Sequence, residues 1–189
     1  DMTRYELFLR ETRTYEIIED VKNFRSEIGV LFLNSYNRDV LTKMFDDNRL
    51  TYTSLFKARP HIFVSKSNPL AKHEVVSLED LEDFPYLSYD QGIHNSFYYS
   101  EEILSQIPHK KSIVVSDRAT LFNLLIGLDG YTIATGILNS NLNGDNIVSI
   151  PLDIDDEIDI VYLKHEKATL SKMGEKFLDN LVKEVTFDN

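Results

Sequence analysis

The chain has 189 residues, no cysteine and a formal net charge of −11. This length allows a sizeable core, in one domain or in two small lobes. The absence of cysteine excludes disulfide scaffolds, thiolate zinc sites and cysteine nucleophiles. The acidic excess argues against direct binding to nucleic acid, because phosphate groups are bound by clustered Lys and Arg. No apolar run is long enough to span a bilayer and no leader opens the chain, so we expect a soluble cytoplasmic protein.

The first third of the chain alternates between predicted strands and helices. Residues 4–10 carry apolar side chains on both parities, which predicts a strand covered on both faces. Thr14 is a candidate N-cap for a helix over residues 15–24, and residues 27–34 form a second apolar strand. Asn37 can cap another helix, and a strand-like segment over residues 50–56 follows. This order predicts a parallel crossover and therefore an α/β lobe.

Residues 61–90 are predicted to form a rigid passage from one lobe to another. An apolar strand over residues 61–65 ends at Asn68-Pro69, because a residue before proline avoids the helical region. Ser77 and Asp80 are spaced as a capping box that opens a short helix. Pro85 ends that helix, and an apolar strand follows at once.

The rest of the chain predicts a second α/β lobe and a return segment. In chain order we expect a helix over residues 95–107, a strand over 112–115, a helix over 119–128 capped by Asp117, and strands over 131–135 and 146–152. The polar loop between the last two strands is predicted to be disordered or a short helix. The acidic run over residues 153–159 is the one plausible second linker, and a strand and a helix starting near Ser171 follow it.

Three motifs within residues 61–90 resemble one known family. They are S-N-P-L-A at residues 67–71, V-S-L-E-D-L at 76–81 and P-Y-L-S at 85–88. Together they are similar to the signature of the effector-binding domain of LysR-type transcriptional regulators. Weaker matches extend over nearly the whole chain, including L-S-x-x-x-x-x-F-L-x-x-L at residues 170–181.

The resemblance implies a two-lobed α/β fold of the periplasmic-binding-protein type II kind, with two Rossmann-like lobes joined by two crossover segments. It places residues 1–85 and 157–189 in lobe I and residues 86–156 in lobe II. A strand and a helix that open lobe I in the family, and the winged helix-turn-helix that binds DNA, would be missing from this chain. The implied partners are a small-molecule effector and a second copy in a homodimer or higher homo-oligomer. DNA would be bound through the missing domain alone, and no cofactor, metal or membrane contact is implied.

Enzyme signatures are absent from the sequence. There is no G-x-S-x-G, H-E-x-x-H, P-loop or dinucleotide-binding motif, and none of the five histidines has metal-ligand spacing. Adjacent acids such as Glu101-Glu102 are interpreted as solvated residues on helices. The sequence leaves two alternatives to the regulator open. One is an exported solute-binding protein of a transporter, which shares the fold, and the other is an enzyme on the same scaffold.

Small polar residues follow the apolar strands where the next helix begins. The carboxyl ends of strands and the helix N-termini beside them meet at one crevice in open α/β sheets, and this edge favours polar or anionic ligands. The turn at residues 11–14 resembles the E-G-x-T turn of the family's effector pocket, with Thr12 in place of glycine. Residues 130–134 resemble G-x-G-I-A, with Thr132 in place of the second glycine. Because Arg13 is the one cation among the candidates, we predict a small anionic metabolite as ligand. The predicted ligand-binding residues are Thr12, Arg13, Thr14, Asn34, Ser35, Ser88, Tyr89, Asp90, Ser116, Asp117, Thr135 and Gly136.

Overall fold

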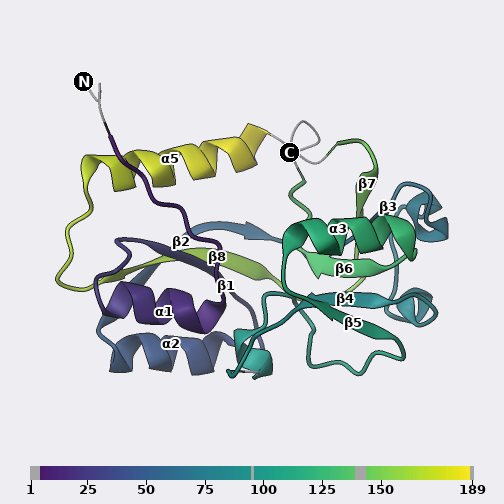
Figure 1. Ribbon diagram of the computed structural model, residues 1–189, viewed down its shortest axis with the longest axis horizontal. Helices are drawn as coiled ribbons and strands as arrows, with labels where there is room; N and C mark the ends of the chain where they lie inside the picture. Colours follow the sequence, from purple (N-terminus) through teal and green to yellow (C-terminus); the bar gives the residue numbers. More distant parts are fainter. Residues whose placement is uncertain (1–4, 95, 139–143, 188–189) are drawn as a thin grey trace.

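The structure is a computed structural model that describes residues 5–94, 96–138 and 144–187. Two lobes lie side by side, each built on its own sheet (Figure 1). The first sheet has the order β1-β8-β2, with strands β1 (Gly29–Leu33), β8 (Ile158–His165) and β2 (Leu50–Ala58). Helices α1 (Thr14–Lys22) and α2 (Arg38–Asp47) cover one face of this sheet, and α5 (Lys172–Phe187) covers the other.

The second lobe contains a five-stranded sheet in the order β5-β4-β6-β3-β7. Its strands are β3 (His61–Ser65), β4 (Tyr86–Tyr89), β5 (Ser112–Val115), β6 (Tyr131–Ala134) and β7 (Ile147–Pro151). Successive side chains of a strand point to opposite faces. Phe63 therefore packs toward α3 (Arg118–Gly127), whereas Ile62 and Val64 pack into a second core beneath the 3₁₀ turns η1 (Pro69–Lys72) and η2 (Glu79–Leu81).

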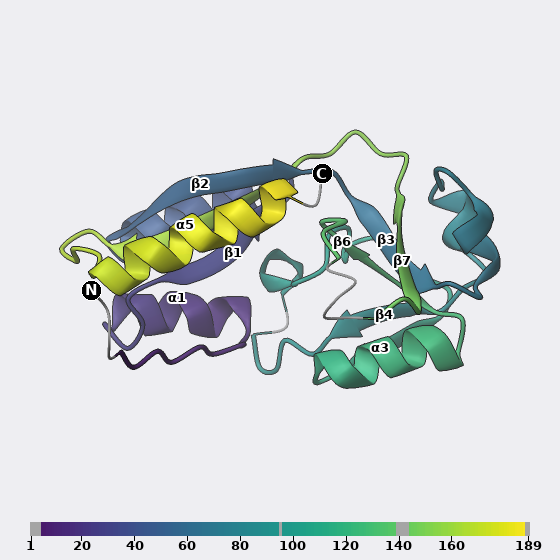
Figure 2. The same cartoon turned by 90° about the horizontal axis from the view of Figure 1, so that it is seen from above.

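The chain crosses between the lobes twice. It leaves the first sheet after β2 and enters the second at β3, and it returns between β7 and β8 (Figure 2). The two crossings lie together: Leu152 N donates to Pro60 O at 3.0 Å, and Lys57 Nζ lies 2.6 Å from a carboxylate oxygen of Glu157. The predicted two-lobed α/β fold with two crossover segments is therefore confirmed.

The predicted boundary between the lobes at residue 85 does not coincide with the division between the sheets. Strand β3 pairs with β6 and β7, so the whole of residues 61–85 belongs to the second lobe. The same pairing shows that residues 61–90 are not a passage between lobes. An apolar strand buried on both faces needs neighbours on both edges, and the second sheet supplies them for β3.

Two predicted elements are absent from the structure. Residues 5–10 lie outside both sheets, with Tyr5, Phe8 and Leu9 largely exposed, because no described strand pairs with this segment; Arg4 lies outside the described residues. The helix predicted over 95–107 is reduced to the 3₁₀ turn η3 (Phe97–Tyr99). Leu104 has a φ of 62°, which no right-handed helix accommodates. Asn95 and most of the polar loop after β6, residues 139–143, also lie outside the described part of the chain.

The local capping predictions have mixed outcomes. Ser77 N donates to Asp80 Oδ2 at 2.8 Å and Asp80 N donates to Ser77 Oγ at 3.3 Å, as a capping box requires. Asp117 caps α3 by accepting from Thr120 N at 2.8 Å. The predicted cap Thr14 is instead the first residue of α1, and Arg13 occupies the N-cap position. Among the described helices, none combines the length and the apolar character that a membrane span requires.

Helix α2 allows a test of the core of the first lobe. Leu41 is fully buried in the cluster that joins α1, α2 and the sheet, whereas its neighbour Val40 is 38% exposed. We expect Leu41→Ala to lower the free energy of unfolding by about 2–5 kcal/mol, because it removes buried methyl groups and leaves a cavity. Val40→Ala should change it by less than about 0.5 kcal/mol. Urea denaturation of both variants checks this, and equal effects would contradict the packing described.

Candidate functional site

A cavity of about 300 Å³ opens between the lobes. The first lobe contributes the turn before α1 and the first turn of that helix, and the second lobe contributes the ends of β4 and β5 and the start of α3. Six of the predicted ligand-binding residues line this cavity, and they are Thr12, Arg13, Tyr89, Asp90, Ser116 and Asp117. Their convergence follows from the topology, because β4 and β5 are parallel and end at the same edge of the sheet.

Arg13 joins the two lobes across this cavity. Its Nη2 lies 2.9 Å from Asp90 Oδ2, and its Nε donates to the main-chain oxygen of Asp90 at 2.8 Å. Its Nη1 lies 3.2 Å from Glu16 Oε1 in the first lobe. The hydrogen bond with Glu16 contributes most to raising the pKa of the guanidinium, and the charge of Asp90 adds to it. The positive charge of Arg13 is therefore balanced by the carboxylates of Glu16 and Asp90.

Gly92 allows Arg13 to approach the second lobe so closely. Its φ is +63°, which L-residues rarely adopt, and a Cβ at this position would lie 3.1 Å from Arg13 Cζ. Asp90 Oδ1 accepts from Gly92 N at 2.9 Å, which fixes the turn. This turn presents both the carboxylate and the main-chain oxygen of Asp90 to the guanidinium.

Aromatic stacks hold the segment after β4 against the first lobe. The rings of Tyr15 and His94 lie 3.5 Å apart between centroids, and those of Tyr36 and Tyr98 lie 4.9 Å apart, both nearly parallel. Tyr99 completes this contact, since its hydroxyl lies 3.6 Å from Met44 Sδ on α2. His94 and Tyr99 thus hold the chain beyond β4 to α1 and α2 of the first lobe.

A second cavity of about 220 Å³ is also lined by residues of both lobes. Phe32 and Ile158 of the first lobe face the ends of β4 and β6 across it, and Thr135, another predicted residue, contributes to its wall. Two carboxyl groups, Glu101 and Glu102, also line it. A few polar groups in a largely apolar lining are typical of small-molecule sites.

Glu102 is a functional candidate that the sequence analysis missed. Glu102 is only 4% exposed, and its carboxyl group accepts a hydrogen bond from Tyr89 N at 2.6 Å. Burial raises the pKa of Glu102 to about 8, so the group is mostly protonated at neutral pH. Burial also raises the pKa of Glu101, and its hydrogen bond from Gln91 lowers it in part. The interpretation of the two acids as residues of a helix is wrong, and for Glu102 the predicted solvation is wrong as well, whereas the residue Glu101 is exposed. No local sequence pattern reports the burial of Glu102.

The remaining predicted residues lie elsewhere in the described structure. Thr14 is buried at the start of α1, and Ser88 lines a third cavity inside the second lobe. Asn34 Nδ2 and Ser35 N donate to Asp156 at 3.2 and 3.4 Å, so both bind the returning crossover. Gly136 has a φ of +82°, and a Cβ there would lie 2.5 Å from His61 Nδ1. Among the described residues, no group of three His, Asp or Glu is placed to hold a metal ion.

Comparison with known proteins identifies relatives of this architecture. The family profile described as LysR substrate binding domain matches residues 4–186. No curated protein matches the chain significantly. Among solved structures, the effector-binding domain of QuiR in complex with shikimate shares 18% identity at a TM-score of 0.59, with 90% of this chain and 77% of that chain covered.

Two further solved structures show the same fold. The effector-binding domain of BenM with its effector benzoate shares 19% identity at a TM-score of 0.60, covering 93% of this chain and 76% of that chain. HinK, a LysR family transcriptional regulator from Pseudomonas aeruginosa, shares 15% identity at a TM-score of 0.62 over 93% of this chain. The chain spans only 58% of the length of HinK.

The buried carboxyl of Glu102 predicts a pH dependence of stability. The pKa of a Glu in an unfolded chain is about 4.3. Between that pH and the folded value of about 8, the folded chain keeps the proton and the unfolded chain loses it. Stability therefore falls as the pH rises through this window, by an amount on the order of 4 kcal/mol. Urea denaturation between pH 5 and pH 8 should show this loss in the native chain and a flatter profile in Glu102→Gln. Parallel profiles would contradict the assigned burial.

Proposed function

We propose that this chain, which belongs to the LysR substrate binding domain family, is the ligand-sensing part of a transcriptional regulator and binds a small metabolite between its lobes. The two-lobed fold with a cavity at the lobe junction supports this proposal. QuiR and BenM share the fold, and their structures hold shikimate and benzoate, respectively. The observation that carries the proposal is Arg13, a cation that spans the cavity and binds both lobes at once.

The charges around the cavity restrict how a ligand can bind. Carboxylates outnumber the two arginines among the residues that line it: Glu11, Glu16, Asp90, Glu101 and Asp117 stand against Arg13 and Arg118. An additional anion would be repelled by this excess. An anionic ligand that replaces the side chain of Asp90 on Arg13 leaves the number of charges around the guanidinium unchanged. We therefore propose that the carboxylate of the ligand takes the place of the Asp90 carboxylate.

This exchange provides a mechanism for signalling. In the structure described here the Arg13–Asp90 pair connects the lobes, and both side chains are partly exposed, at 38% and 48%. A ligand that binds Arg13 breaks this link and adds contacts of its own to the second lobe. It thus has different affinities for two arrangements of the lobes, which is the condition for shifting the equilibrium between them.

The proposal extends to the whole protein of which such a domain is a part. We propose that the chain operates in the cytoplasm as a homodimer or higher homo-oligomer, without catalysis, and that DNA is bound by a separate domain. The net charge of −11 supports this division of labour, because a surface with so few cations relative to anions is poorly suited to a phosphate backbone.

Substitutions at the lobe link test the proposed exchange. A thermal-shift screen against amino acids, sulfur metabolites and small organic acids would first identify a binder, since a ligand at a hundredfold excess over its Kd adds about 2.7 kcal/mol. Asp90→Asn keeps the hydrogen bond to Gly92 N and removes the competing charge, so it should tighten binding of an anionic ligand several-fold. Arg13→Gln should abolish binding. Isothermal titration calorimetry measures both effects.

Glu16→Gln is the matched control for this experiment. It removes the second carboxylate partner of Arg13, but this partner lies in the first lobe and does not connect the lobes. Its effect on affinity should be smaller than that of Asp90→Asn. If Arg13→Gln binds the ligand as tightly as the native chain does, the proposed recognition of a carboxylate is refuted.

A further inference from the structure

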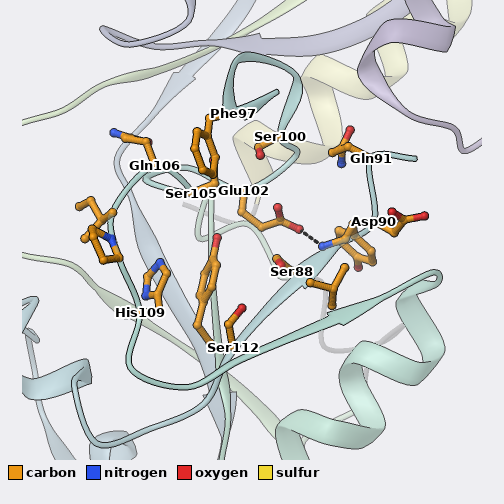
Figure 3. A pocket seen from close by; sticks show the side chains of 15 residues that line it. Ser88, Asp90, Gln91, Phe97, Ser100, Glu102, Ser105, Gln106, His109 and Ser112 are labelled. Carbon is orange, nitrogen blue, oxygen red and sulfur yellow. Dashed lines mark hydrogen bonds between the residues drawn. The ribbon is translucent and has the colours of Figure 1, made fainter. Parts of the chain in front are cut away.

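Residues 97–107 follow an irregular course that leaves one face of the second sheet poorly covered. A cavity of about 460 Å³ lies between this segment and strands β4 and β5. Phe97 on the segment is 57% exposed and Val114 on β5 is 60% exposed, although both line the cavity. Figure 3 shows Phe97 across from Ser88 and Ser112 of the two strands. Apolar surface on both sides of one cavity therefore remains in contact with solvent.

The same residues have the sequence of an amphipathic helix. Residues 97–107 contain no Gly or Pro, and at about 100° per residue the aliphatic side chains and the Phe fall on one side of a helix. These residues are Phe97, Ile103, Leu104 and Ile107. Glu102 falls on the opposite side. A helix here would bury its apolar side on the sheet and direct this carboxyl group to solvent.

Both ends of such a helix are present in the structure. Ser96 has the extended backbone of an N-cap, and its Oγ accepts a hydrogen bond from Tyr98 N at 3.4 Å. Tyr99 N donates to Ser96 O at 2.9 Å, which closes a first 3₁₀ turn. At the other end Pro108 follows Ile107, and helices usually end at the residue before a proline.

The middle of the segment contains a strained residue. Ser100 leaves the helical region with a ψ of 141°, and Leu104 has a φ of 62°. The left-handed region is unfavourable for a bulky residue with a Cβ, and such a conformation persists only where its surroundings enforce it. Ile103 and Leu104 pack against the second core, and these contacts offset the strain. The irregular course thus depends on a balance between main-chain strain and side-chain packing.

Glu102 adds a second cost to the irregular course. It is 4% exposed, and its carboxyl group accepts a hydrogen bond from Tyr89 N at 2.6 Å. Removing a carboxyl group from water is unfavourable, and a hydrogen bond recovers only part of that cost. A helical course that returns Glu102 to solvent removes the cost altogether.

We propose that residues 97–107 are a two-state element, irregular in the structure described above and helical in a second state that the free protein also populates. In the helical state Phe97, Leu104 and Ile107 fill the cavity over β4 and β5, and Glu102 faces solvent. The helix relieves the strain at Leu104 and gives up the present contacts of Ile103 with the second core.

The two states differ at the junction between the lobes as well. Glu101, Glu102 and Ile103 line the second inter-lobe cavity, and Glu101 also lines the cavity that Arg13 spans. A change of course in residues 97–107 therefore reshapes both inter-lobe cavities. A ligand that fits one shape better shifts the balance between the two states. This last step rests on the proposed function, whereas the existence of the two states does not.

Substitutions at Leu104 separate the two states. Glycine adopts the left-handed conformation without strain and is unfavourable inside a helix, so Leu104→Gly favours the irregular state for both reasons. In the native chain we expect the ¹³Cα chemical shifts of residues 100–107 to lie between coil and helix values. In Leu104→Gly they should move to coil values, with the ratio of helical to irregular chains lowered at least tenfold. Ser105→Ala should raise this ratio about twofold, because alanine is the better helix former.

Two matched controls accompany this experiment. Leu104→Ala also removes the leucine side chain, but it keeps a Cβ and a high helix propensity, so its ratio should exceed that of Leu104→Gly at least tenfold. Arg49→Gly relieves a φ of 57° in the first lobe and should leave the shifts of residues 100–107 unchanged.

Two results would overturn the proposal. Coil shifts at residues 100–107 in the native chain and in Ser105→Ala would show that no helical state is populated. Full helix shifts that persist in Leu104→Gly would show that no irregular state competes with the helix. None of these measurements uses a ligand, so either failure leaves the function proposed for the cleft untouched.

Discussion

Strand β8 is the constraint on which the arrangement of the whole chain depends. It is the middle strand of the first sheet, and all of its residues pair with β1 or β2. Without it, β1 and β2 would have no common neighbour, so the first lobe cannot form until the chain has returned from the second. Asp159 on this strand is 5% exposed and accepts hydrogen bonds from Arg38 at 3.1 Å and Ser54 at 2.5 Å. Side-chain hydrogen bonds thereby hold the returning strand β8 to α2 and β2, in addition to the main-chain pairing within the sheet.

The two crossings make each lobe rigid inside and the junction between the lobes adjustable. Within a lobe, buried apolar side chains must remain packed, because cores have few alternative arrangements. Between the lobes, the contacts include the Arg13–Asp90 pair, the stacks of Tyr15 and Tyr36, and the packing of Phe32 and Ile158 on the core of the second lobe. Partly exposed ion pairs contribute little to stability, so a ligand that substitutes for one loses little in doing so. Such a junction suits the proposed sensing of a metabolite.

The sequence predicted what depends on neighbouring residues and missed what depends on distant ones. The capping box at Ser77 and the cap at Asp117 were readable because their partners lie three residues away. The lobe to which residues 61–65 belong was not readable, since their pairing partners lie about 70 to 90 residues further along the chain. Six of the predicted residues meet at one cavity because strand ends converge, whereas the burial of Glu102 depends on a segment whose helical period was misleading.

Glu102 connects the two kinds of cavity physically. Glu102 lines both the second inter-lobe cavity and the cavity inside the second lobe, and one oxygen of its carboxyl group accepts a hydrogen bond from Tyr89 N. Because burial raises its pKa to about 8, a change of solvent exposure on either side alters the protonation of a group that faces both. A molecule that donates a hydrogen bond to this carboxyl from one side favours the ionised form and raises the negative charge felt on the other. Any such coupling acts in both directions, since linkage between two binding equilibria is reciprocal.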